Sequence, residues 1–340
     1  ICTSLEDVMA SSEKYFWTEL LIQNTIGIFH VNLTKSNLNN MPHLRRLIIV
    51  NHLNKIEPLF FGQFELITRI TLYDNELKTL EANTFTRLER LEELDLRNNA
   101  IEHMESLSVS FCKIDTVDLS HNSLRILIND IFKGSVVRKL VITHNKLLDI
   151  QHNAMPFHLK VLNLNYNEFQ TFSLSKLKRT ESVTDVKLSH NKLYTVEVFH
   201  ISNKIEALDV SFNNLYTFPI TPSMLRNRHN IKFISLAYNR LRSFDVDVFK
   251  GSGIDFTVMG NPWNCKCANK LIKVFNNSTS MIRQSLCDKK FLQSGAAPYC
   301  IMGTMWYNED CPKVEIFPEE YFHHFQSALP KSDDCYSWPP

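Results

Sequence analysis

A motif of constant form recurs along this chain, and its clearest copies read L-x-x-L-x-L-x-x-N-x-L-x-x-L, starting at Leu91, Ile114, Leu159 and Ile231. Its asparagines are Asn75, Asn99, Asn122, Asn145, Asn167, Asn191, Asn213, Asn239 and Asn261. Successive asparagines are therefore 24, 23, 23, 22, 24, 22, 26 and 22 residues apart. A unit of this size cannot bury its own apolar face, so the pattern predicts stacked repeats that share one core.

The motif and its period resemble those of leucine-rich-repeat proteins. The resemblance implies an α/β repeat solenoid of horseshoe form, in which each L-x-L segment is a short strand of a parallel concave sheet. Strand alternation sends the leucines inward and the intervening residues outward. The asparagine follows at the turn, where its amide can satisfy buried backbone groups. Phenylalanines on the returning segments, such as Phe60, Phe61, Phe85 and Phe132, are expected to fill the wider convex half.

Six of the eight cysteines lie near the end of the chain: Cys265, Cys267, Cys287, Cys300, Cys311 and Cys335. The segment N-P-W-N-C-K-C, residues 261–267, resembles the cysteine-rich carboxy-terminal cap of extracellular leucine-rich-repeat proteins. That resemblance implies a disulfide-stapled cap with a Cys265–Cys287 bond and Cys267 bonded to Cys300 or Cys311. A zinc site at Cys265 and Cys267 is disfavoured, because one intervening residue is short for a zinc pair.

The other two cysteines are isolated in the sequence. Cys112 is expected to be a buried free thiol, because a bridge to Cys2 would have to cross several repeats. Cys2 is then left for an intermolecular disulfide or for a partner cysteine outside this sequence.

The sequence divides into four regions. Residues 1–27 are predicted to form an amino-terminal cap, 28–255 about ten leucine-rich repeats, 256–300 the cysteine-rich cap, and 301–340 an acidic extension with prolines and aromatics. The formal net charge is +1, but residues 301–340 carry two lysines against seven acidic residues. Basic residues elsewhere are scattered rather than massed, which argues against nucleic-acid binding. No apolar run of about 18 residues occurs, so no transmembrane segment is predicted.

Two columns of side chains are candidates for partner binding. The residue before each turn asparagine is aromatic or imidazole in six repeats: His121, His144, Tyr166, His190, Phe212 and Tyr238. Stacked repeats would bring these residues about 5 Å apart along the concave edge. Because free histidine titrates near neutral pH, binding through this column is expected to depend on pH. The outward strand positions are acidic around 92–118 and basic around 138–160, with Arg138, Lys139 and Lys160 beside the aromatic column. There are two competing interpretations. The ring residues are then ordinary repeat residues without a binding role, and the charged strand positions form a solvated face.

The cysteines and the sequons at Asn32, Asn276 and Asn277 together predict a secreted, extracellular glycoprotein, and the first residue, Ile1, is consistent with a processed chain. Segment 285–300 also resembles the cap of the short mosquito leucine-rich-repeat immune proteins, which implies haemolymph-like localisation and a complement-like protein or a microbial surface as partner. No catalytic or cofactor motif is evident in the sequence. His323 and His324 do not predict a metal site either, because adjacent histidines point apart on a helix.

The hypothesis is therefore a non-enzymatic innate-immune binder whose protein ligand sits on the concave face or the carboxy-terminal extension. Two alternatives remain open: a cell-adhesion or guidance module or ectodomain, and a circulating inhibitor of a secreted enzyme.

Overall fold

The structure is a computed structural model in which the chain forms two compact units. The first comprises Ile1–Phe169 and Lys176–Val186, and the second Gln170–Ser175 and Lys187–Pro340. The residues that the structure describes are 14–23, 31–35, 38–51, 53–180, 182–198, 204–219, 230–242, 254–258 and 260–262. The six carboxy-terminal cysteines, Cys2, Asn276, Asn277 and the whole extension 301–340 lie outside them, as does most of the predicted cap 256–300.

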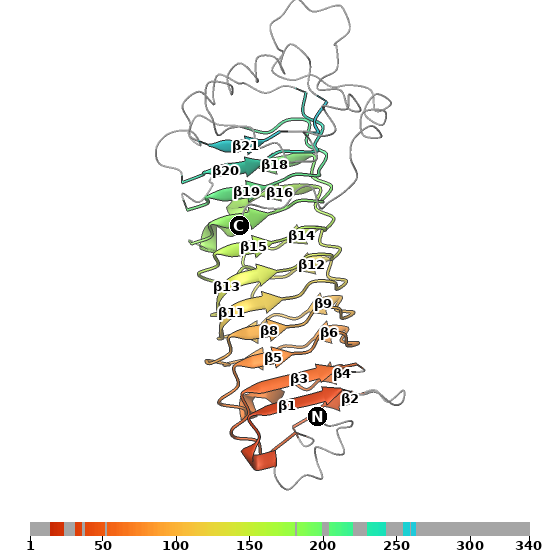
Figure 1. The fold of residues 1–340 in the computed structure, drawn as a ribbon, viewed down its shortest axis with the longest axis vertical. Helices are drawn as coiled ribbons and strands as arrows, with labels where there is room; N and C mark the ends of the chain where they lie inside the picture. The colour runs from red at the N-terminus through yellow and green to blue at the C-terminus, as the bar shows by residue number, and fades with distance from the viewer. Residues whose placement is uncertain are drawn as a thin grey trace, which may run out of the picture. The chain divides into compact units, whose positions relative to one another are not determined.

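In the first unit, the long strands of successive repeats pair in parallel and in chain order (Figure 1). They are β1 (Glu19–Gln23), β3 (Arg46–Val50), β5 (Arg69–Thr71), β8 (Glu93–Asp95), β11 (Lys113–Asp118), β13 (Val136–Val141) and β15 (Val161–Asn163). Ile70 on β5 pairs with Leu47 on β3 and with Leu94 on β8, so the strand leucines align from repeat to repeat. Strand β1 belongs to this sheet although it lies within the range assigned to the amino-terminal cap.

The second unit repeats the arrangement with β19 (Ala207–Asp209), β20 (Phe233–Ser235) and β21 (Asp255–Thr257). Leu208 pairs with Ile234, and Ile234 pairs with Phe256, again in parallel. Strand β17 (Asp185–Lys187) lies at the boundary between the two units. We call the outward surface of the long strands the sheet face.

The returning segments contain short strands and 3-10 turns. The short strands pair between neighbouring repeats: β2 (Val31–Leu33) with β4 (Leu53–Ile56), β6 (Thr79–Leu80) with β9 (His103–Met104), β7 (Phe85–Thr86) with β10 (Val109–Ser110), β12 (Ile126–Leu127) with β14 (Asp149–Ile150), and β16 (Thr171–Ser173) with β18 (Thr195–Glu197). The 3-10 turns are η1 (Lys14–Phe16), η2 (Phe60–Gln63) and η3 (Leu174–Thr180).

The α/β class predicted an α-helix in the returning segment of each repeat. That prediction is wrong for the described residues, which contain no α-helix. In the described repeats these segments form short strands and 3-10 turns instead, with phenylalanines such as Phe61 and Phe85 packed inward. No helix in the described part of the chain is long and apolar enough to cross a membrane.

Phenylalanines fill the interior of the returning side, as predicted. Phe60, Phe61, Phe85 and Phe132 are at most 2% exposed. Phe61 stacks on Phe85 of the next repeat with ring centroids 5.0 Å apart. The core is thus continuous between these neighbouring repeats, and the phenylalanines need no ligand to account for them.

The asparagine ladder joins the repeats through their backbones. In the first unit, Asn145 is 7% exposed and its Oδ1 accepts from the N–H of Leu124 at 3.0 Å. Its Nδ2 donates to the carbonyls of Leu119 at 3.0 Å and Thr143 at 3.1 Å. Asn213 makes the same set of bonds in the second unit, to Leu193 and Leu188 of the preceding repeat. The amide is well suited to this position because it both donates and accepts in one plane.

Candidate functional site

The residues that precede the ladder asparagines form stacks of rings, as the sequence predicted. In the first unit, His121 stacks on His144 at 4.2 Å between centroids and 11° between planes. His144 in turn stacks on Tyr166 at 4.2 Å and 13°. Both histidines are exposed, and Tyr166 is half-buried. We call these three residues the first ring stack.

A second ring stack lies in the second unit. His190 stacks on Phe212 at 4.1 Å, and Phe212 stacks on Tyr238 at 4.5 Å with planes 3° apart. Exposure falls along this stack, since His190 and Phe212 are half-buried and Tyr238 is only 8% exposed. The most exposed rings of the predicted column are therefore His121 and His144 of the first stack.

Backbone conformation explains the stacking. His121, His144 and Tyr166 have φ of 56°, 52° and 56°, in the left-handed region. The turn imposes this φ in every repeat, and the N–H of His121 donates to the carbonyl of Thr143 in the next repeat at 2.9 Å. Identical dihedrals one repeat apart place equivalent side chains parallel. A non-glycine residue in this region costs about 1–2 kcal/mol, although histidine and asparagine tolerate it better than most.

Three basic residues lie together on the sheet face of the first unit. Arg138 and Lys139 are on β13, and Lys160 immediately precedes β15. The N–H of Lys160 donates to the carbonyl of Arg138 at 2.8 Å, so the two residues are neighbours across strands. All three are exposed. The first ring stack continues from the same strands, since His144 and Tyr166 lie a few residues beyond β13 and β15.

Most charges on this face are paired between neighbouring strands. Arg46 contacts Glu19 at 2.8 Å, and Arg69 contacts Glu93 at 3.7 Å. Arg138 contacts Asp115 at 3.0 Å, although both side chains are more than half exposed and such a pair is weak. Lys139 and Lys160 form no ion pair with any described residue. Lys113 on β11 is likewise exposed and without an ion pair among these residues, so uncompensated positive charge on this face lies at Lys113, Lys139 and Lys160, along the strands that lead into the first ring stack.

Sequence reasoning missed the role of the aspartate or asparagine that ends several of the long strands. Asp95, Asp118, Asn163 and Asp209 each accept a hydrogen bond from the N–H two residues later, at distances of 2.9–3.1 Å. Asp95 and Asp209 are buried, at 5% and 8% exposure. These side chains close the turn after the strand rather than presenting a free acidic surface. A short acid or amide two residues before a polar residue is the signal that was available.

The carboxyl of Asp209 supports a prediction about pH. Burial raises its pKa above the ordinary value, against hydrogen bonds from Ser211 and the charge of Lys187. The folded state therefore binds a proton more readily than the unfolded chain, and this contribution to stability is lost as pH rises through the folded pKa. We expect Asp209→Asn to raise the melting temperature relative to wild type at pH 7, and this gain to shrink at pH 4.

The neighbouring strand supplies evidence that an amide fits this position. Asn163 is the last residue of β15, as Asp209 is of β19, and its Oδ1 accepts from the N–H of Asn165 at 3.1 Å. The two melting temperatures, measured by circular dichroism at each pH, check the prediction. A variant less stable than wild type at pH 7 but not at pH 4 would show that burial does not raise the pKa of this carboxyl.

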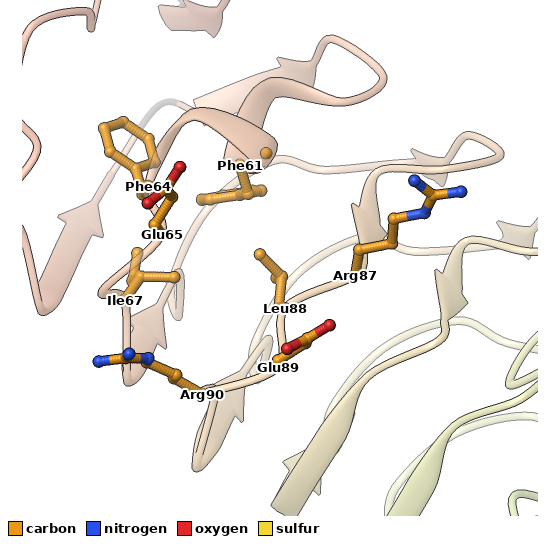
Figure 2. A pocket seen from close by; sticks show the side chains of 9 residues that line it. Phe61, Phe64, Glu65, Ile67, Arg87, Leu88, Glu89 and Arg90 are labelled. Atoms are coloured by element: carbon orange, nitrogen blue, oxygen red, sulfur yellow. The ribbon is translucent and has the colours of Figure 1, made fainter.

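A separate hollow of about 280 Å³ opens on the returning side of the first unit (Figure 2). Its floor is formed by buried Phe61, Phe64, Ile67 and Leu88, and its charged rim by Glu65, Arg87, Glu89 and Arg90. The guanidinium of Arg87 points away from the hollow in Figure 2. None of the residues that the sequence predicts for partner binding lies here. No group of three or more potential metal ligands occurs within the described ranges.

Cys112 is a buried free thiol, as predicted. Its Sγ lies 3.2 Å from the carbonyl of Ser110, and burial raises the pKa of the thiol to about 11. A thiol with so high a pKa is almost entirely protonated at neutral pH and is a poor nucleophile. Cys112 is therefore a packing residue.

Comparison with known proteins agrees with this architecture. The profile of the family described as "Leucine rich repeat" matches residues 42–101. The chain therefore contains leucine-rich repeats. Toll-like receptor 3 of Boselaphus tragocamelus is 27% identical to it over 229 residues, a match that covers 63% of this chain. The chain spans only 23% of that receptor's length.

Solved leucine-rich-repeat structures share the fold. The leucine-rich repeat domain of mosquito LRIM1 aligns with a TM-score of 0.58 at 20% identity, covering 79% of this chain and 83% of that domain. The Toll chain of the Toll–Spatzle complex from Drosophila aligns with a TM-score of 0.53 at 14% identity, covering 72% of this chain and 38% of that chain. At these identities the likeness concerns the fold alone.

Proposed function

We propose that this leucine-rich-repeat protein is a secreted, non-enzymatic binding protein of innate immunity that engages a protein partner through the sheet face of its first unit. The observation that carries the proposal is that Lys139 and Lys160 are exposed and without an ion pair among the described residues, on a sheet face whose strands lead into the turns that hold the exposed rings of His121 and His144. Rings held by stacking provide contact area with little loss of side-chain entropy on binding. Adjacent lysines attract an acidic partner and orient it.

The immune and extracellular parts of the proposal have separate support. The cysteine content and the sequons favour secretion, with Asn32, which is exposed on β2, as a candidate for glycosylation. Fold likeness to LRIM1 and to Toll, and sequence likeness to Toll-like receptor 3, favour recognition in immunity. The Toll structure is that of a complex with a protein partner, Spatzle, which favours a protein ligand.

The test begins with partner capture from extracellular fluid by the full chain, followed by affinity measurement with charge-reversed protein. Lys139→Glu combined with Lys160→Glu is expected to lower the affinity for the captured partner by about tenfold or more. The loss of affinity should be larger at low salt, where charges are screened less. The matched control is Lys78→Glu with Lys178→Glu, which makes the same change in net charge at two exposed lysines away from the site. Equal affinity of the two double variants would exclude the sheet face.

The extension 301–340 is the alternative binding surface for the partner. Deleting residues 313–340 should leave the affinity unchanged if the sheet face carries the interaction. Loss of binding with an unchanged melting temperature would assign the contact to the extension instead.

A further inference from the structure

The long parallel sheet of the first unit has an end at β1. In the described part of the chain, β1 pairs with β3 on one side and with no strand on the other. Successive residues of a strand direct their N–H and C=O groups to opposite edges. The carbonyl of Thr18 accepts from the N–H of Arg46 on β3 at 3.1 Å, so the even-numbered residues of β1 face β3. Glu19, Leu21 and Gln23 therefore face the outer edge of the sheet.

The outer edge of β1 can accept a further strand. The backbone groups of Glu19, Leu21 and Gln23 have no hydrogen-bond partner within the described ranges. Glu19 and Gln23 are exposed and Leu21 is half-buried, so the edge is accessible. The strand sequence ELLIQ contains no proline or lysine, which are residues that commonly protect an edge against pairing with another chain. The backbone of β1 is thus arranged for strand addition.

The strand is complementary to a second copy of itself. In an antiparallel pairing centred on Leu21, this residue lies opposite the partner's Leu21, and Glu19 lies opposite the partner's Gln23. These are the residues whose backbone groups face outward, so each pair is of the hydrogen-bonded kind and every outward N–H and C=O group of both copies finds a partner. Side chains match as well, because leucine faces leucine, a carboxylate faces an amide, and no like charges are opposed.

We propose that two copies of this chain associate through β1, so that the sheet of one copy continues into the sheet of the other. A single two-fold axis accounts for the free backbone groups, the apolar centre and the polar ends of the strand, which favours a second copy over an unrelated strand. This interface does not use Lys139 or Lys160, so it is additional to the binding surface proposed above.

Exposed aromatic side chains beside β1 favour the same interface. Tyr15 and Phe16 of η1 are 50% and 75% exposed, and their rings lie edge to face with centroids 5.4 Å apart. The turn η1 lies just before β1 at the same end of the first unit (Figure 1). A two-fold axis through β1 places one such pair of rings beside each end of the paired strands, where they add apolar surface to the contact.

Sedimentation velocity of the full chain over a wide range of concentrations is the test. Wild type is expected to show a concentration-dependent equilibrium between monomer and dimer. Leu21→Pro removes an N–H that faces the outer edge and leaves the bonds to β3 intact, a position where proline is tolerated. It should weaken the dimer by about tenfold or more, because one hydrogen bond is lost from each copy. Its melting temperature should stay near that of wild type when both are measured at concentrations where wild type is monomeric.

The matched control is Leu21→Ala, which shortens the same side chain but keeps the N–H. It should dimerise more tightly than Leu21→Pro. Equal weakening by the two substitutions would show that the side chain rather than the backbone makes the contact, and would overturn strand pairing. A wild-type chain that remains monomeric at every concentration would overturn the proposal outright.

Two substitutions at Gln23 test the antiparallel register. Gln23→Lys places a cation opposite the partner's Glu19 and should tighten the dimer, whereas Gln23→Glu opposes two carboxylates and should weaken it. Each pair occurs twice in the dimer, so the expected change is about threefold or more in either direction. Affinities that shift in the same direction would contradict the register. Lys139→Glu with Lys160→Glu should leave the dimer unchanged, which separates this test from that of the proposed function.

Discussion

Replacing one ladder asparagine in the middle of the first unit should destabilise the protein strongly. Asn145→Ala removes the acceptor for the N–H of Leu124 and the donor to the carbonyls of Leu119 and Thr143. Because these groups are buried, water cannot replace the amide, and the expected loss is about 2–4 kcal/mol in the free energy of unfolding. The midpoint of urea denaturation measures it.

Asn54→Ala is the matched control. Asn54 lies on β4 and is half-buried, and its side chain makes no hydrogen bond to the described residues. Its replacement should change the unfolding free energy by less than about 0.5 kcal/mol. Similar midpoints for both variants would mean that the ladder amides contribute nothing beyond their packing volume.

A methyl group at Gly260 should have a comparable effect for a different reason. Gly260 has φ of 70°, and a Cβ there would lie 2.8 Å from two ring carbons of Tyr238. Tyr238 is buried and stacked on Phe212, so its ring has little room to move. Gly260→Ala thus combines left-handed strain with overpacking, and should cost about 2–4 kcal/mol.

Two other glycines turn this prediction into a graded series. Gly134→Ala meets the ring of Phe111, which is half-exposed and can move aside, so only the backbone cost of about 1–2 kcal/mol should remain. Gly62 has nothing within 4 Å of a built Cβ, and Gly62→Ala should be neutral or slightly stabilising. Melting temperatures that do not fall in the order Gly62, Gly134, Gly260 would contradict the steric argument.

Much of the architecture is predictable from the sequence because the repeat is encoded locally. The interval between asparagines sets the length of each turn of the solenoid, and Leu-x-Leu alternation sets which side chains face inward, as Leu94 and Leu96 do at 0% exposure. The content of the returning segments is not encoded in this way. Segments of this length can form a short helix, a 3-10 turn or a bridge, and the choice depends on packing against neighbours such as Phe61 on Phe85.

The candidate site was partly predictable for a related reason. One side chain per repeat at a fixed position must form a column, so the first ring stack follows from periodicity alone. Which charges are neutralised does not follow, because the pairing of Arg138 with Asp115 depends on side-chain conformers across strands. The turn-closing role of Asp209 was missed because its outward position indicates exposure, whereas its carboxylate accepts a hydrogen bond from the backbone N–H of Ser211.

The asparagine ladder gives the array a polarity. Asn261 bonds to Leu236 and Leu241, and Asn75 bonds to Ile49 and Leu53, so each amide serves backbone groups of the repeat before its own. Removing repeats from the amino-terminal side therefore removes the backbone groups to which the next amide bonds. Removing repeats from the carboxy-terminal side instead leaves buried backbone groups in the last repeat without the amide that bonds to them. Shortened versions of this protein should tolerate trimming at the beginning better than trimming at the end, where each new terminus needs a substitute for the missing amide.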